Sequence, residues 1–246
     1  MKSVKVGDIF PTNGNGQVEV LEYNGYYDVK VKHIGEFGGH IATVNVASLK
    51  GGRVKNPYKP VLYNVGYVGV GEYARSENQR DTKVYATWRD MLRRCYCDKS
   101  LSKRETYRGC SVVDHWHNFQ NFAHWYYQQP NAGKHGFQLD KDLRILNNKI
   151  YGPETCSFVP SHINSLLTDR AAERSEYGQG VHKHYKGYKV HISLGENKKT
   201  LGTYETPERA RAVYKKAKED YVKVIANKYK NVIHPEVYET LMAWEA

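Results

Sequence analysis

The stretch FQLDKDLRILNNKIYGPETCSFVPSHINS, residues 137–165, decides how the middle of the chain folds. It begins with two carboxylates one residue apart, Asp140 and Asp142, and it ends with an apolar segment that runs into Pro160 and Ser161. Proline and serine are typical of the first positions of a helix. We therefore predict a β-hairpin that continues directly into a helix.

This arrangement predicts a pair of oxygen ligands. Asn164 lies in the first turn of the predicted helix, so we expect its side chain to be aimed back at the first strand, near Asp140. Hard divalent cations bind carboxylate and amide oxygens. The stretch thus predicts a site for one divalent cation, and the alternative is a purely structural hairpin whose acidic residues are solvated.

The same motifs resemble the core of the HNH (ββα-metal) endonucleases, and more closely the phage homing-type members. The resemblance rests on Leu139-Asp140-Lys141-Asp142, Tyr151-Gly152-Pro153-Glu154-Thr155-Cys156, Phe158 and Asn164. It implies that Asp140 and Asn164 bind the metal, magnesium or manganese, which stabilises the scissile phosphate and the leaving oxygen. It covers about residues 82–170.

Two positions depart from the family pattern. Lys141 stands where the family has the histidine that acts as general base, and Thr155 stands at the central asparagine position. A lysine accepts no proton at neutral pH unless its pKa is strongly lowered, although it can hold a phosphate. Asp142, His162 or a water on the metal are the alternatives for the base. The candidate catalytic residues are therefore Asp140, Lys141, Asp142 and Asn164.

Composition favours a polyanionic partner. The 246 residues carry a net charge of +11, with a pI near 9.3, and the excess is spread over the whole chain. Nucleic acid is the first expectation, and an acidic membrane surface is a weaker rival. The first ten residues are too polar for a signal peptide, and no apolar run approaches a membrane span. We expect an intracellular protein, in the host cytoplasm if it is phage-encoded.

The four cysteines are expected to be reduced, and Cys95, Cys110 and Cys156 are expected to be buried thiols. Cys95 and Cys97 have a single spacer between them, which fits a zinc site poorly, and Cys110 and Cys156 are isolated. An intracellular chain also argues against a disulfide framework.

The fold class expected for the whole chain is α+β. Residues 1–60 contain short segments of alternating polarity separated by Asn-Gly and Gly-Gly turns, which predict a small β-barrel whose function is open. Residues 61–170 form a connector and the HNH-like ββα-metal domain with flanking helices. Apolar periodicity places those helices at Thr82–Tyr96 and Asn118–Gln129.

A charged linker at residues 171–177 is the predicted boundary before a third domain, residues 178–246. Three segments of strand character precede Thr206, which is suited to cap a helix, and Pro207, which is suited to its first position. We predict a three-stranded sheet with a packed helix. A terminal helix at Pro235–Trp244 carries an apolar stripe that we expect to dock on the chain.

This last segment resembles the ethylene-response-factor (APETALA-type) DNA-binding domain over about residues 178–222. The resemblance rests on Gly180-Val181 and Leu201-Gly202-Thr203-Tyr204. It implies that the exposed sheet face enters the major groove, through the positions that match the family's readers: His182, His184, His191, Ser193, Lys198 and Thr200. The arginines and tryptophans of the family are absent there, so its bidentate guanine contacts do not carry over.

Together the sequence predicts a metal-dependent DNA endonuclease of homing or nicking type that carries its own reader of double-stranded DNA. A single site cuts one strand, so nicking is expected of a monomer, and the oligomeric state is open. One alternative is a DNA-binding protein whose nuclease site is lost. Another is a phage factor that binds a host protein.

Overall fold

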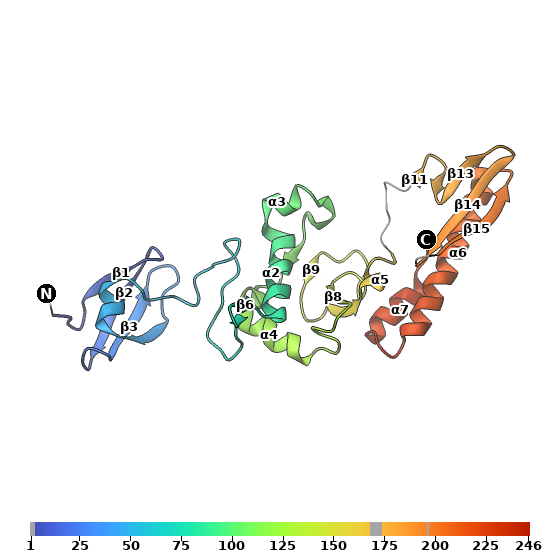
Figure 1. Cartoon of the computed structure of the whole chain (residues 1–246). Helices are drawn as coiled ribbons and strands as arrows, with labels where there is room; N and C mark the ends of the chain where they lie inside the picture. The colour runs from blue at the N-terminus through green and yellow to red at the C-terminus, as the bar shows by residue number, and fades with distance from the viewer. Residues whose placement is uncertain (1–2, 168–173, 196) are drawn as a thin grey trace. The chain divides into compact units, whose positions relative to one another are not determined.

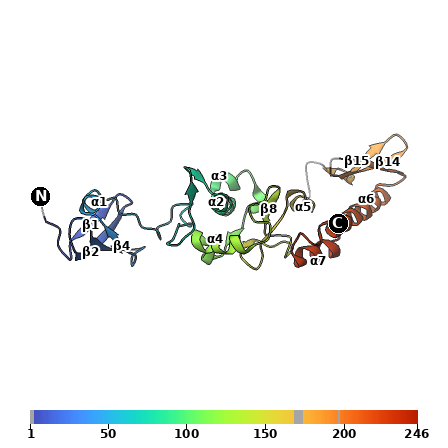
Figure 2. The same ribbon diagram turned by 60° about the horizontal axis from the view of Figure 1, so that its bottom comes forward.

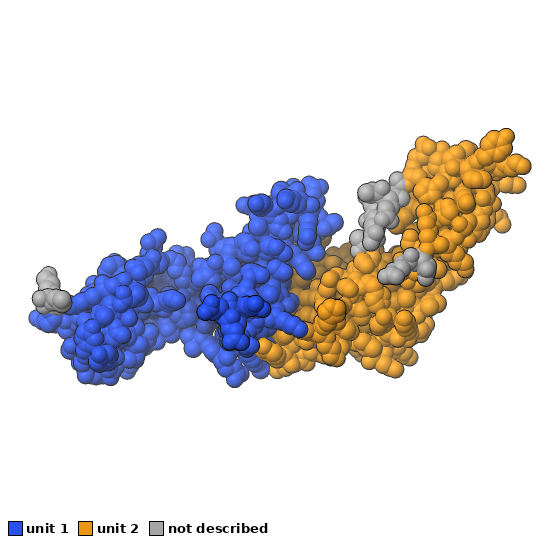
Figure 3. All heavy atoms as spheres, viewed as in Figure 1, with its two compact units in different colours: residues 1–108, 112–124 blue, residues 109–111, 125–246 orange. Residues whose placement is uncertain are grey.

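The computed structural model describes residues 3–167, 174–195 and 197–246. The fold is mixed α+β: several small sheets alternate with helices, and the described residues contain seven α-helices. The chain consists of two compact units (Figure 3). The first comprises residues 1–108 and 112–124, and the second comprises residues 109–111 and 125–246. The division into domains 1–60, 61–170 and 178–246 stays a prediction.

The N-terminal module is an antiparallel sheet in the order β1 (Ile9–Thr12), β2 (Gly16–Tyr23), β3 (Val29–Ile34) and β4 (Ile41–Val44) (Figure 1). Valines of β2 and β3 are buried against α1 (Val46–Lys50), which lies beside the sheet (Figure 2). The predicted barrel is wrong in this respect: β1 and β4 each pair on one side only among the described strands, so the sheet is open. The first and last of the four strands are not paired with each other, so the described sheet is not closed into a barrel.

The first unit continues through β5 (Ser76–Glu77), β6 (Arg80–Asp81), α2 (Lys83–Tyr96) and α3 (Asp98–Leu101). The predicted helix at Thr82–Tyr96 is confirmed, because Thr82 is the N-cap of α2 and its side chain accepts from the backbone N–H of Tyr85. The predicted apolar face is buried: Val84, Trp88, Met91, Leu92 and Cys95.

Short elements lead to the second predicted helix. A 3-10 turn (Glu105–Tyr107), β7 (Ser111–Val112) and another 3-10 turn (Asp114–His117) precede α4 (Phe119–Gln128). The prediction of this helix is confirmed to within one residue at each end, and its three predicted core aromatics are buried: Phe119, Phe122 and Tyr126.

The predicted hairpin is confirmed in the second unit. Strand β8 (Phe137–Asp140) pairs antiparallel with β10 (Ser157–Pro160), and α5 (Ser161–Asn164) follows at once. The loop between the strands contains the short β9 (Ile150–Tyr151). Helix α5 is a single turn that begins after Pro160, as the proline and serine predict.

The C-terminal part is a three-stranded antiparallel sheet covered by a long helix, as predicted. Short strands β11 (Arg174–Ser175) and β12 (Gly178–Gln179) precede it, and residues 171–173 of the predicted linker lie outside the described residues. The sheet order is β13 (Val181–His184), β14 (Gly187–Leu194) and β15 (Asn197–Tyr204).

Helix α6 (Pro207–Tyr229) packs on one face of this sheet. Thr206 caps the helix through the backbone N–H of Arg209, and Pro207 opens it. Val181, Val190 and Ala210 form the core between sheet and helix.

Helix α7 (Pro235–Ala243) and the end of α6 share one hydrophobic core with the hairpin. Val237 and Leu241 of α7 are fully buried, which confirms that the terminal helix docks on the chain. The same core holds Leu143, Val159 and Ile163 of the hairpin region. The hairpin therefore owes much of its apolar packing to residues about eighty positions further along the sequence.

All four cysteines are free thiols, and Cys95, Cys110 and Cys156 are buried, as expected. Burial raises the pKa of the Cys156 thiol to about 12. No helix within the described ranges is both long and apolar enough to cross a membrane.

Candidate active site and nucleic-acid surface

The hairpin places Asp140 at the last position of β8, directly opposite Ser157 of β10. Asp140 is 7% exposed, and its Oδ1 accepts from the backbone N–H of Asp142 at 2.9 Å and of Leu143 at 2.7 Å. These two bonds fold the chain back at the start of the loop, as a capping aspartate does.

Burial raises the pKa of the Asp140 carboxyl to about 6, and the two backbone donors only partly offset it. The Oγ of Ser157 is also buried and has no hydrogen-bond partner among the described residues. A carboxyl strongly perturbed by desolvation beside an unsatisfied hydroxyl is typical of a functional site.

Lys141 is held inside the loop. Its side chain is 5% exposed, and its Nζ donates to Asp142 Oδ1 and, at 2.9 Å, to the carbonyl of Asn148. The ammonium also lies 5.7 Å from the ring centroid of Tyr151. A buried lysine bonded in this way holds the loop closed.

Asn148 and Arg144 close the rest of the loop. The amide Nδ2 of Asn148 donates to the carbonyls of Lys141 and Ile150, at 2.8 and 2.7 Å. Arg144 donates from Nη1 to the carbonyl of Pro153 and from Nε to Glu236 of α7, at 2.9 and 2.6 Å. The hydrogen bond from Arg144 lowers the pKa of the Glu236 carboxyl.

Asn164 points back at β8, as predicted, but its described contact is with Gln138. The Nδ2 of Asn164 lies 3.1 Å from Gln138 Oε1. Gln138 precedes Asp140 by two residues in an extended strand, so both side chains lie on the same face of β8. Asp140, Gln138 and Asn164 thus belong to one face of the hairpin.

The donor set of this face fits a magnesium-type ion. A single carboxylate and an amide oxygen are hard ligands, and such ions bind through one or two carboxylates together with substrate phosphate oxygens and water. The described residues hold no cluster of three or more histidine, cysteine, aspartate or glutamate side chains, so a site richer in protein ligands is not formed by them.

The side chains of the other base candidates, Asp142 and His162, have their described contacts with residues other than Asp140. Asp142 is half-exposed and is paired with Lys141. The ring of His162, on α5, packs against Tyr229 of α6 in a tilted arrangement, with the ring centroids 4.8 Å apart. Burial and the neighbouring Lys228 lower the pKa of His162, which keeps its ring neutral at pH 7.

The six predicted reader residues come together on the sheet, with His182 and His184 on β13, His191 and Ser193 on β14, and Lys198 and Thr200 on β15. Strand alternation turns His182 and His191 away from the buried valines, and their rings lie 6.0 Å apart. Thr200 Oγ1 lies 3.1 Å from His191 Nδ1. Burial, then Lys198, Lys189 and His182, lower the pKa of His191.

A groove of about 950 Å³ joins part of this face to α5 and α6. His182, His191, Ser193 and Lys198 line it together with His162 and Ser165 of the hairpin side and with Lys218 and Lys228 of α6. His184 and Thr200 are not among its lining residues.

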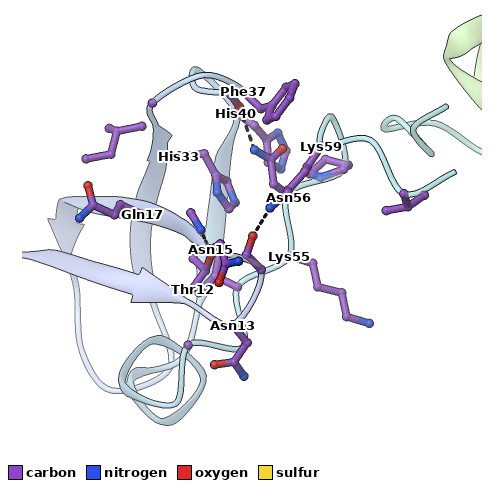
Figure 4. Close-up of a pocket in the computed structure, with 18 of the residues that line it drawn as sticks. Thr12, Asn13, Asn15, Gln17, His33, Phe37, His40, Lys55, Asn56 and Lys59 are labelled. Atoms are coloured by element: carbon purple, nitrogen blue, oxygen red, sulfur yellow. Dashed lines mark hydrogen bonds between the residues drawn. The ribbon is translucent and has the colours of Figure 1, made fainter. Parts of the chain in front are cut away.

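A second pocket, of about 1060 Å³, lies in the N-terminal module where three loops meet (Figure 4). The Asn56 side chain donates to the carbonyl of Phe37 at 2.8 Å, and His33 and His40 stack at 5.7 Å. His33 is 2% exposed, and within the described part of the chain its Nε2 has no hydrogen-bond partner. Burial, and then the neighbouring His40, lower the pKa of this ring.

Sequence reasoning missed Gln138, Arg144, Asn148 and Ser157. Gln138 could have been predicted from the alternation of side chains along a strand, because residues 138 and 140 lie on the same face of β8. The positions of Arg144, Asn148 and Ser157 depend on how the loop and the strands come together and on contacts with α7, which a local sequence pattern does not predict.

Neither a family model, nor a curated protein, nor a solved structure matches the chain.

Proposed function

We propose that this protein is a metal-dependent DNA endonuclease that nicks one strand, with the hairpin as its catalytic element and the three-stranded sheet as its DNA reader. The proposal rests mainly on one face of the hairpin. There Asp140 ends the first strand as a buried carboxyl with a raised pKa, and Asn164 of α5 is turned back toward the same strand. The net charge of +11 supports a nucleic-acid substrate.

Asp140 and Asn164 would hold the divalent ion, which supplies charge stabilisation of the phosphate and the leaving oxygen when bound. In hydrolysis, water adds to phosphorus, the P–O bond to the leaving sugar oxygen breaks, and that oxygen takes a proton. The role of Lys141 is to keep the loop closed around Asp140 through Asp142 and Asn148. Its ammonium has no free lone pair, so the proton acceptor is another group.

The test is conversion of supercoiled plasmid in magnesium or manganese by wild type, Asp140→Ala and Asp140→Asn. The amide introduced by Asp140→Asn keeps an oxygen that accepts from the two backbone donors, so this variant separates metal binding from loop folding. We expect nicking by wild type and a loss of at least about 100-fold in both variants. Asp114→Asn, which removes a fully exposed carboxylate, is the control that keeps activity.

A second function, a DNA-binding protein without scission, is favoured by one observation. Lys141 is committed to the loop at the position where the resembled family has its base. Salt-sensitive DNA binding by wild type without any nicking would establish this second function instead.

A further inference from the structure

The groove between the hairpin side and the sheet is lined by positively charged side chains. Lys198, Lys218 and Lys228 line it, and no described lining residue is aspartate or glutamate. Lys228 lies 5.6 Å from the ring centroid of Tyr229, and Lys198 and Lys228 are exposed. A concave surface lined by one sign of charge focuses its field and attracts polyanions.

Aromatic rings alternate with these lysines along α6. Tyr214, Tyr221 and Tyr229 line the same groove and are partly exposed, and they fall on the helix face that carries Lys218 and Lys228. His162 also lines the groove, and its ring centroid lies 4.8 Å from that of Tyr229, with the two rings tilted. Lysines interleaved with rings in a concave surface are typical of proteins that bind unpaired bases.

We propose that this groove binds a single strand of nucleic acid, with the phosphates at the three lysines and the bases against the tyrosine and histidine rings. A duplex is convex and keeps its bases stacked inside, so rings on the wall of a groove contact bases only when a strand is unpaired. His182, His191, Ser193 and Lys198 line the groove, so a single strand bound there occupies four of the six predicted reader positions, and of those six His184 and Thr200 stay outside it.

The proposal rests on the proposed function only in taking nucleic acid as the partner, and the two are tested separately. Binding is measured in EDTA, where metal-dependent scission stops, and scission is measured on plasmid. Strand binding without scission would leave the groove in place and refute the nuclease. Scission without strand binding would support the nuclease and refute the proposed strand-binding groove.

The experiment is fluorescence anisotropy of the full chain with a labelled oligothymidylate of about 12 nucleotides, titrated at several salt concentrations. The unlabelled strand and a duplex of the same length serve as competitors. In the Lys198→Gln/Lys228→Gln double variant we expect at least about tenfold weaker binding of the strand. The slope of log Kobs against log salt should fall by about 1.4, because each lost phosphate contact on a single strand removes about 0.7.

Two further variants make the test specific. Tyr221→Leu should weaken strand binding by about fivefold or more with the salt slope unchanged, because it removes a stacking surface and no charge. Lys186→Gln/Lys215→Gln removes the same charge from exposed lysines outside the groove, one in the turn between β13 and β14 and one on α6, and should bind like wild type. Circular dichroism checks that each variant is folded.

Either of two results would overturn the proposal. One is an equal loss for the groove pair and the control pair of lysines, which would make the effect one of net charge. The other is a duplex that competes as well as the single strand and is lost equally in the groove variant, which would make the groove a site for duplex backbone.

Discussion

The loop of the hairpin and the outer face of the sheet are both rich in polar residues, but they use them differently. In the loop, Lys141 and Asn148 bond backbone carbonyls of the same loop. On the sheet, His182 and Lys198 are exposed and no described carboxylate lines the groove that they border. The polar side chains of the loop therefore stabilise the fold, and those of the sheet are open to a partner.

This difference separates two kinds of residue within one basic protein. A change in the loop should alter the free energy of unfolding and leave binding of a strand intact. A change on the sheet side should weaken binding of a strand and leave the free energy of unfolding almost unchanged.

Leu241→Ala in α7 should destabilise the second unit by about 2–5 kcal/mol, because it empties space in the core that α7 shares with the hairpin. Urea unfolding of the full chain measures it. Val224→Ala, at a position that is 63% exposed on α6, is the matched control and should change stability little. Equal small effects of both would mean that α7 does not support the hairpin.

Lys141→Met should lower the free energy of unfolding by about 1–3 kcal/mol, because it leaves the carbonyl of Asn148 without its donor. Lys149→Met, at an exposed lysine of the same loop, is the control for lost charge. Strand binding in EDTA should stay within about twofold of wild type for both variants, since neither position lines the groove. Weaker binding by Lys141→Met alone would contradict the separation.

Lys198→Gln alone should change the free energy of unfolding by no more than about 0.5 kcal/mol, as substitutions of exposed side chains usually do. Its effect should appear in the salt dependence of strand binding instead. A destabilisation as large as that of Lys141→Met would show that the sheet face is also structural.

The smallest effect concerns the pKa of His191. Burial is the main cause of its lowered pKa, and Lys198 adds to it, so Lys198→Gln should move the pKa upward toward the ordinary 6.5. Because the folded pKa lies below the unfolded one, the contribution of His191 to stability is present above pH 6.5 and declines as the pH falls below it. Titration of the ring proton by NMR checks the shift, and an unchanged pKa would mean that Lys198 lies too far away.

Local signals predicted much of the fold. Thr206 and Pro207 marked the start of α6, and the apolar spacing of residues 82–96 marked α2, because caps and periodicity act within a few residues. The pairing of β8 with β10 also followed from sequence order and turn residues. These features need no knowledge of distant segments.

The features that sequence reasoning missed are the long-range ones. Arg144 and Glu236 form an ion pair although they are 92 residues apart, and no local sequence pattern near either residue predicts it. The prediction of a closed N-terminal barrel was wrong for a similar reason. Closure depends on pairing between the first and last strands, which are far apart in the sequence. For Lys141, residue type alone did not distinguish a phosphate ligand from a residue that holds a loop closed.

The core shared by α7 and the hairpin has a consequence for the synthesis of the chain. Val159 and Ile163 are made long before Val237 and Leu241, with which they share that core. A ribosome that has reached only the three-stranded sheet carries a hairpin whose apolar side is still uncovered. The apolar core behind the hairpin is therefore completed only after α7 leaves the exit tunnel, so the hairpin of a nascent chain lacks part of its packing until the last helix has been made.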